Sequence, residues 1–297
     1  MITRLPEDLL LEIIELLSFD IQTLRSCALM SYAWAQRCRP YIFREVNLGE
    51  KTNPEPRYRK LRDVLEKNSS FADYTHELCL YIGRVKPEAG ASGDGFIDIT
   101  DPGLPQFLGH FNQLEEVSIS QSYDSRDARI PKTLVKPFMR VLGLETLRDV
   151  TLWDFMCLPI SILDHAPYVT NLSLYAIDFD TWQDQDQTPP PAPSQTPNDP
   201  PLCHRAPISL TVKYCPPYIH EDLERLVREE RGLFEYHWIE KLVLGPNCHD
   251  PNVDEIGFCS GLLKAVGRSQ EGVDGETGLT QFTLQPSQGI LLSQGDL

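Results

Sequence analysis

Leucine and isoleucine recur every three or four residues near the start of the chain, with acidic residues between them. Over residues 7–17 this spacing predicts an amphipathic helix. Asp20 and Ser31 are residue types that cap helices, and each precedes a further helical pattern. We therefore expect three short helices within residues 1–45. Helices this short carry more large apolar side chains than they hide by packing together, so a partner or the rest of the chain must cover the remainder.

A different pattern follows residue 45: an apolar residue, two others, an apolar residue, one other, and a third apolar residue. The alternation in its last positions is typical of a short strand with one buried face. Clear copies begin at Leu114, Leu147, Val169, Ile239 and Leu279, and weaker copies lie at Phe43–Leu48, His76–Leu80 and Ile208–Val212.

Helical patterns lie between these strands, at Arg57–Asn68, Lys132–Leu144, Cys157–His165, His220–Leu233 and Glu255–Val266. Alternation of strand and helix at intervals of about 20–40 residues predicts an α/β fold of stacked repeats. The pattern is similar to an irregular leucine-rich repeat, although it lacks the Asn or Cys that regular repeats place after the strand. A doubly wound α/β sheet is the alternative. The strands argue against it, because they are short and apolar only at alternate positions.

The N-terminal pattern resembles the F-box motif. The matched positions are Leu5-Pro6-Glu7, Ile13-Ile14-Glu15-Leu16-Leu17, Asp20, Leu24, Cys27-Ala28-Leu29, Trp34 and Tyr41-Ile42-Phe43. The helix, Asn68 and strand that come next are similar to the arrangement in fungal-type F-box proteins. The resemblance implies an F-box-like helical segment at 1–45 and an irregular leucine-rich-repeat-like domain at 46–297.

F-box segments dock on a Skp-type linker, which ties them to a cullin–RING ubiquitin ligase. The resemblance therefore implies an adaptor that binds the linker, and through it a cullin, and presents a protein substrate held by the repeat domain. The linker-binding residues that it implies are Leu5, Pro6, Ile13, Ile14, Leu17, Leu24 and Trp34. We interpret Leu9, Leu16 and Ala28 instead as core residues of the helical segment. The alternative function is a non-ligase scaffold whose N-terminal helices cap the solenoid.

Aromatic residues follow several of the predicted strands. If the strands stack side by side, residues just after them line one rim of the solenoid, where large rigid side chains suit peptide binding. Trp153, Tyr175 and Trp182 are the candidate substrate-binding residues. Trp182 lies within residues 178–202, an acidic and proline-rich insert that we expect to be disordered because it cannot form a core.

Charge and cysteine usage restrict the partners and the compartment. The formal net charge is −16, which disfavours nucleic acid and anionic membranes as partners. The eight cysteines have no disulfide-framework spacing, so we expect free and mostly buried thiols. The first residues lack the pattern of a secretory leader, and no run of about 18 apolar residues occurs. These features predict a cytoplasmic or nuclear protein.

Motifs for catalysis are missing from the sequence. Neither GxSxG nor HExxH occurs, and the glycine-rich stretch at 90–95 lacks the spacing of a phosphate-binding loop. A zinc site would have to draw its ligands from a set whose spacing is unlike that of zinc ligands: Cys203, His204, Cys215, Cys248, His249, Asp250 and Cys259. We therefore expect no cofactor, no metal and no enzymatic activity, with an α/β enzyme as the remote third hypothesis.

Overall fold

The computed structural model describes residues 7–49, 54–84, 95–122, 129–155, 157–180, 209–215, 241–245 and 281–284. Its first elements are the three expected helices, α1 (Glu7–Leu16), α2 (Ile21–Ala28) and α3 (Tyr32–Ile42). Both predicted caps form, because the Asp20 carboxylate accepts a hydrogen bond from the Thr23 N–H at 3.1 Å and the Ser31 hydroxyl accepts one from the Trp34 N–H at 3.3 Å.

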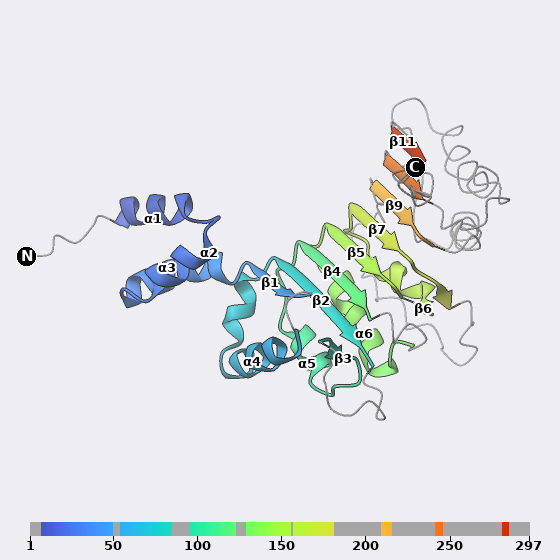
Figure 1. The fold of residues 1–297 in the computed structure, drawn as a ribbon, viewed down its shortest axis with the longest axis horizontal. Coiled ribbons are helices and arrows are strands. Elements are labelled where there is room, and N and C mark those ends of the chain that lie inside the picture. The colour runs from blue at the N-terminus through green and yellow to red at the C-terminus, as the bar shows by residue number, and fades with distance from the viewer. Residues whose placement is uncertain are drawn as a thin grey trace, which may run out of the picture.

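All eight predicted strands are present and form one parallel sheet. The strands are β1 (Glu45–Leu48), β2 (Glu77–Gly83), β4 (Glu116–Gln121), β5 (Asp149–Trp153), β7 (Asn171–Tyr175), β9 (Ser209–Lys213), β10 (Lys241–Gly245) and β11 (Gln281–Leu284). They pair in the order in which they occur along the chain (Figure 1). The chain is therefore an α/β protein in which each strand is added beside the preceding one.

Three further strands of two residues each were not predicted. β3 (Ile97–Asp98) pairs with the end of β2, and β6 (Leu158–Pro159) pairs with β8 (Phe179–Asp180). Because β8 is ordered and Phe179 is buried, the prediction of disorder from residue 178 is wrong for residues 178–180. Residues 181–202 of that insert lie outside the described residues.

Helical elements connect the strands. They are α4 (Pro54–Lys67), α5 (Leu104–Gly109), α6 (Lys132–Leu142) and the 3-10 helices η2 (Ser69–Tyr74) and η4 (Ile160–His165). The first two predicted connections correspond to α4 and α6. The third, at 157–165, contains a short strand and then a 3-10 helix rather than an α-helix. The two predicted helices at 220–233 and 255–266 lie outside the described residues.

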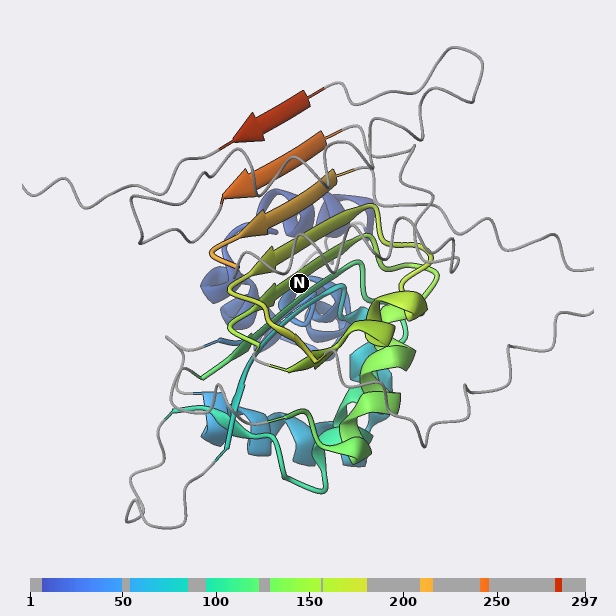
Figure 2. The same ribbon diagram turned by 90° about the vertical axis from the view of Figure 1, so that its right-hand side faces the viewer.

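The main core lies on one face of the sheet. Register pairs the middle apolar residue of each motif with its counterpart on the next strand, as with Val117, Val150 and Leu172. This row is buried, and Leu134 and Phe138 of α6 belong to the same core. Helices α4, α5 and α6 lie together on one side of the sheet (Figures 1 and 2). A doubly wound sheet would reverse its strand order, and the described strands do not.

A second, smaller core holds the three N-terminal helices together. Ile14, Leu24 and Cys38 are its buried residues, one from each helix. This segment reaches the rest of the protein mainly through α3 and η2, where the rings of Phe43 and Phe71 lie 4.9 Å apart. In Figure 1 the helices extend beyond the β1 end of the sheet rather than lying under it.

The same turn follows three successive strands. Asp154, Ala176 and Tyr214 come directly after β5, β7 and β9, and each has a left-handed backbone with φ between 50° and 58°. Their N–H groups donate at 2.7–2.9 Å to the carbonyl of the last residue of the next strand, which is Tyr175, Lys213 or Gly245. The repetition of this geometry shows that the repeat seen in the sequence extends to the backbone.

Candidate functional site

Helix α1 has two apolar stripes at the same spacing. One stripe packs into the small core and consists of Leu10, Ile14 and Leu17. The other consists of Leu9, Ile13 and Leu16, and these side chains are exposed, Leu16 to 76%. A helix with apolar residues on both sides normally buries both. Here the second side is open.

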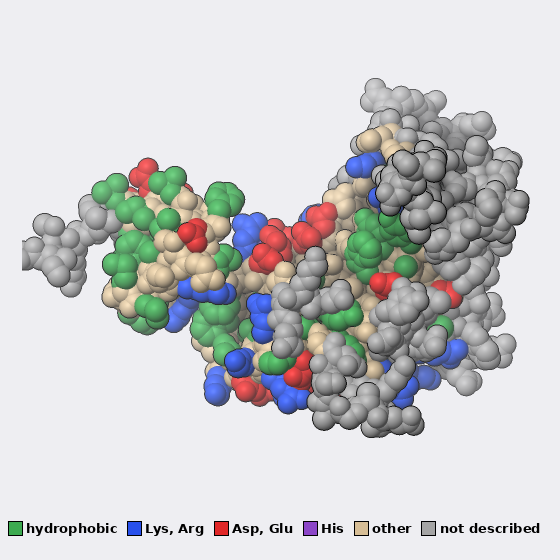
Figure 3. Space-filling model, in the orientation of Figure 1, with side chains coloured by type: hydrophobic (Ala, Val, Ile, Leu, Met, Phe, Trp, Pro, Cys, Tyr) green, Lys and Arg blue, Asp and Glu red, His purple; other side chains and the backbone are tan. Residues whose placement is uncertain are grey.

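Exposed apolar residues continue through the turns of the same segment. Phe19, between α1 and α2, is 97% exposed, and Leu29, Met30 and Tyr32 are also exposed. We define the N-terminal apolar surface as Leu9, Ile13, Leu16, Phe19, Leu29, Met30 and Tyr32. These are seven of the ten large hydrophobic side chains that are exposed in the described part of the chain. Figure 3 shows hydrophobic atoms gathered over α1, α2 and α3.

Burial changes the set of linker-binding residues predicted from sequence. Ile14 and Leu24 are fully buried in the small core, so the prediction that they contact a partner is wrong. Leu17 and Trp34 are half-buried and pack against that core, whereas Ile13 is 37% exposed. Leu5 and Pro6 lie outside the described residues.

The prediction that Leu9 and Leu16 are core residues of the helical segment also needs correction. Leu9 and Leu16 are exposed, contrary to their interpretation as core residues, and only Ala28 packs against the small core. Leu9 and Leu10 begin two stripes with identical spacing. Periodicity alone therefore could not decide which of them would face the other helices.

A second candidate surface is the face of the sheet opposite the main core, which we name the open face. Its side chains alternate with the buried ones along β1, β4, β5, β7 and β9, whereas on β10 Val243 of this face is buried as well. Trp153 and Tyr175 occupy neighbouring positions on this face, and their rings stack with centroids 3.8 Å apart and an angle of 8°. The Lys213 ammonium lies 5.9 Å from the centre of the Tyr175 ring. The structure thus brings together two of the predicted substrate-binding residues, and the third, Trp182, lies outside the described residues.

Four carboxylates form a row at the beginning of neighbouring strands on the open face. We name Glu45, Glu77, Glu116 and Asp149 the acidic row, because they occupy matching register positions on β1, β2, β4 and β5. Figure 3 shows acidic side chains along this edge of the sheet. Partial burial raises the pKa of Glu116, and repulsion by the other three carboxylates raises it further.

The acidic row was not identified from the sequence. A signal for it does exist, since each of these acidic residues directly precedes the middle apolar residue of its strand motif. Between the acidic row and the aromatic pair lie smaller side chains, which are Asn47, Cys79, Ser118, Thr151 and Ser173. The open face therefore has carboxylates at one edge, low side chains in the middle and stacked rings at the other edge.

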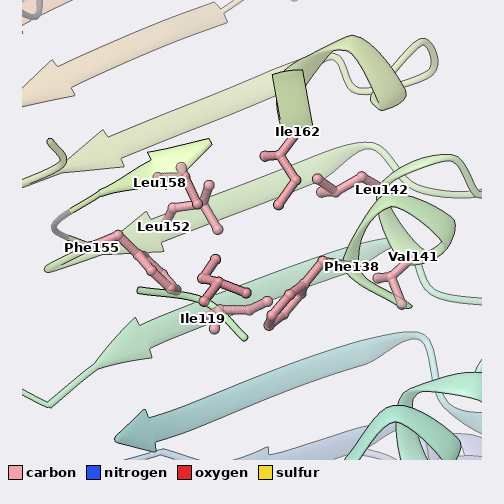
Figure 4. A pocket seen from close by; sticks show the side chains of 9 residues that line it. Ile119, Phe138, Val141, Leu142, Leu152, Phe155, Leu158 and Ile162 are labelled. Carbon is pink, nitrogen blue, oxygen red and sulfur yellow. The ribbon is translucent and has the colours of Figure 1, made fainter. Parts of the chain in front are cut away.

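A pocket beneath the sheet offers no polar chemistry. It lies among β4, β5, α6 and β6, and apolar side chains line it (Figure 4). Its volume of about 10 Å³ is close to that of a single water-sized sphere, too small for an organic ligand. The pocket is best explained as a packing defect of the main core.

The described cysteines are free thiols. Cys38 and Cys215 are buried, whereas Cys27, Cys79 and Cys157 are half-buried, so fewer thiols are buried than expected. Burial raises the pKa of Cys215 to about 12, which makes this thiol a poor nucleophile and a poor metal ligand. Within the described ranges no three His, Cys, Asp or Glu residues are placed to hold a metal ion, and the other members of the hypothetical zinc set lie outside those ranges.

Comparison with known proteins found no family model, no curated protein and no solved structure that matches this chain. Among the helices that the structure describes, none has the length and apolar character needed to cross a bilayer.

Proposed function

We propose that this protein is a substrate-recognition adaptor of a Skp–cullin–F-box ubiquitin ligase. Its N-terminal apolar surface docks on the Skp-type linker, and its sheet, a leucine-rich-repeat-like solenoid, binds the protein to be ubiquitinated. The observation that carries this proposal is the second apolar stripe of α1, which stays exposed after the helices have formed their own core.

Hydrophobic burial supplies the binding energy for docking. Covering about 600 Å² of apolar surface contributes roughly 15 kcal/mol before the costs of association and ordering. Leu16, Phe19 and Leu29 are more than three-quarters exposed, so they have most of their surface left to bury. Because these side chains are hardly buried in this chain, a partner that covers them gains hydrophobic binding energy without disturbing the small core.

The geometry favours docking over the alternative in which the helices cap the solenoid. A cap would turn its apolar residues toward the end of the sheet and bury them there. Instead, Leu9, Ile13 and Leu16 are open, and the main contact between the segment and the sheet domain is the one from α3 to η2. The small core also makes the helical segment a separate packing unit.

An adaptor of this kind catalyses no bond change itself. It raises the effective concentration of substrate lysines near the charged conjugating enzyme, which is a consequence of linking two binding events in one assembly. The open face of the sheet is the surface suited to the substrate. Its repeated strand ends and stacked Trp153–Tyr175 pair provide a rigid and partly apolar platform.

Charge substitutions on the N-terminal apolar surface test the proposal. We expect the double variant Leu16→Glu, Leu29→Glu to weaken binding of the full chain to the purified Skp-type linker about 100-fold or more, because two carboxylates would be buried without partners. Both side chains are highly exposed, so the fold should be retained.

Val64→Glu is the matched control, since Val64 is also an exposed hydrophobic residue on a helix, but lies outside the N-terminal segment. Co-purification with the linker should be unchanged for this control. Equal linker binding by the wild type and the double variant would refute the docking assignment.

A further inference from the structure

We infer that the open face of the sheet binds a basic partner: an extended protein segment rich in Lys and Arg, lying across the beginnings of β1 to β5. If the protein is the proposed adaptor, proteins that carry such a segment are its substrates. Only the ubiquitination of the bound protein rests on that proposed function, and the binding itself does not. The occupant follows from the charge of the face and from the aromatic pair beside it.

The acidic row has the spacing of an extended chain. Neighbouring strands lie about 5 Å apart, so the carboxylates from Glu45 to Asp149 extend over roughly 15 Å. An extended peptide repeats its side-chain direction about every 7 Å. Three basic residues at alternate positions of such a peptide would therefore cover the whole row.

Among the residues that the structure describes, nearby cations leave most of the row without an ion pair. Arg44 lies 3.5 Å from the Glu77 carboxylate, which is one pairing for four acids. The Arg148 guanidinium donates instead to backbone carbonyls, those of Glu145 at 2.7 Å and Leu147 at 2.9 Å. In the described part of the chain no ion pair involves Glu116, whose pKa is raised by partial burial and then by repulsion from its acidic neighbours. A bound cation would remove that repulsion.

The aromatic pair adds a contact that does not depend on the carboxylates. Trp153 is 36% exposed, and its ring is stacked on Tyr175 in a fixed orientation. A ring face of this kind attracts guanidinium and ammonium groups as well as apolar side chains. Trp153 lies four positions after Asp149 along β5, about 13 Å at strand spacing, so one peptide and its side chains can reach both.

The exposure of the open face is unusual for a parallel sheet. Parallel sheets are normally covered on both faces, because helices or partners protect them from water. Helices α4, α5 and α6 cover only the opposite face. The small residues between the acidic row and the rings would let a peptide backbone approach the strands.

Fluorescence anisotropy with labelled peptides tests this inference on the full chain. The probe is a nine-residue peptide with Arg at alternate positions and Ser between them, and the reference peptide has Gln in place of each Arg. We expect the Arg peptide to bind at least about tenfold more tightly than the reference, and its affinity to fall as salt increases.

Two variants with the same change in net charge distinguish binding at the acidic row from general attraction between the peptide and an acidic protein. The triple variant Glu77→Gln, Glu116→Gln, Asp149→Asn should weaken Arg-peptide binding about tenfold or more. The control Asp63→Asn, Asp73→Asn, Glu145→Gln removes three exposed carboxylates elsewhere, and should change the affinity less than about twofold.

Equal losses in the two triple variants, or no preference for Arg over Gln, would overturn the inference. Tighter binding of an acidic peptide or of single-stranded nucleic acid would overturn it as well. Linker binding is measured on the same proteins and should be unaffected by either triple variant. Peptide binding without linker binding would reject the adaptor function and support the site for a basic segment. Linker binding without peptide binding would support the adaptor function and reject that site.

Discussion

Left-handed backbone at Asp154, Ala176 and Tyr214 shows how single residues maintain the repeat. For a residue with a side chain this conformation costs about 1–2 kcal/mol. Each of the three N–H groups gains a hydrogen bond to the neighbouring strand, which offsets part of that cost. This turn could not be predicted from the residue types, because glycine, the residue that adopts it without strain, occupies none of these positions.

Ala176→Gly should therefore raise the free energy of unfolding by about 0.5 kcal/mol, the relief of strain less the greater backbone entropy of glycine. Chemical denaturation of the two proteins measures the difference. Ser173→Gly, at a regular position in β7, is the control and should lower the stability. A loss of stability in both variants would contradict the role assigned to the left-handed turn.

The acidic row predicts a pH effect at the residue scale. The pKa of Glu116 is raised in the folded protein, so the folded state favours the protonated carboxyl group. The stability that this group contributes is fully present below its pKa in the unfolded chain, and it is lost as the pH rises through its pKa in the folded protein. Glu116→Gln should consequently stabilise the protein at pH 7 by about 0.5 kcal/mol and make no difference below about pH 4. Glu145→Gln should show no such gain, and a gain independent of pH would exclude this cause.

Elements differ in how far the sequence could predict them. The alternating motif located all eight main strands, because burial of one face requires that periodicity. Helix α5 was missed because its six residues are too few to show a helical repeat. Strand β3 was missed because it has only two residues and closely follows the glycine-rich stretch at 90–95. The orientation of α1 could not be predicted, since two equivalent stripes compete for the same core.

Caps are the elements of the N-terminal segment that can be tested most simply. Ser31→Ala removes the hydroxyl that accepts the Trp34 N–H, and should destabilise α3 by about 1 kcal/mol. Hydrogen exchange of the α3 amides measures this change. Ser26→Ala, inside α2 with its hydroxyl bonded to the Gln22 carbonyl, is the control and should leave exchange in α3 unchanged. Equal protection of α3 in the wild type and Ser31→Ala would show that the cap contributes nothing.

At the scale of the molecule, the described residues form two cores, which are joined mainly through α3 and η2. Composition and periodicity predicted the α/β class and the existence of both parts. They could not predict the open faces, because exposure depends on how the parts pack in three dimensions. Both candidate surfaces, the N-terminal apolar surface and the open face, are defined by side chains that the fold leaves uncovered.

Removal of residues 1–42 separates docking from capping at this scale. If the helices form a separate unit, the melting temperature of the remaining chain should change by only about 3 °C, the effect of losing a few contacts with η2. Calorimetry gives the melting temperature of each protein. Loss of the cooperative transition would show that the helices are required to cap the sheet domain.

Hydrogen exchange of the full chain with and without the purified Skp-type linker tests whether the N-terminal apolar surface is the docking site. We expect the linker to slow exchange across α1 and the turn between α2 and α3, around Leu16, Phe19 and Leu29, and to leave exchange in the strands of the sheet unchanged. Unchanged exchange throughout residues 7–32 at saturating linker would contradict it.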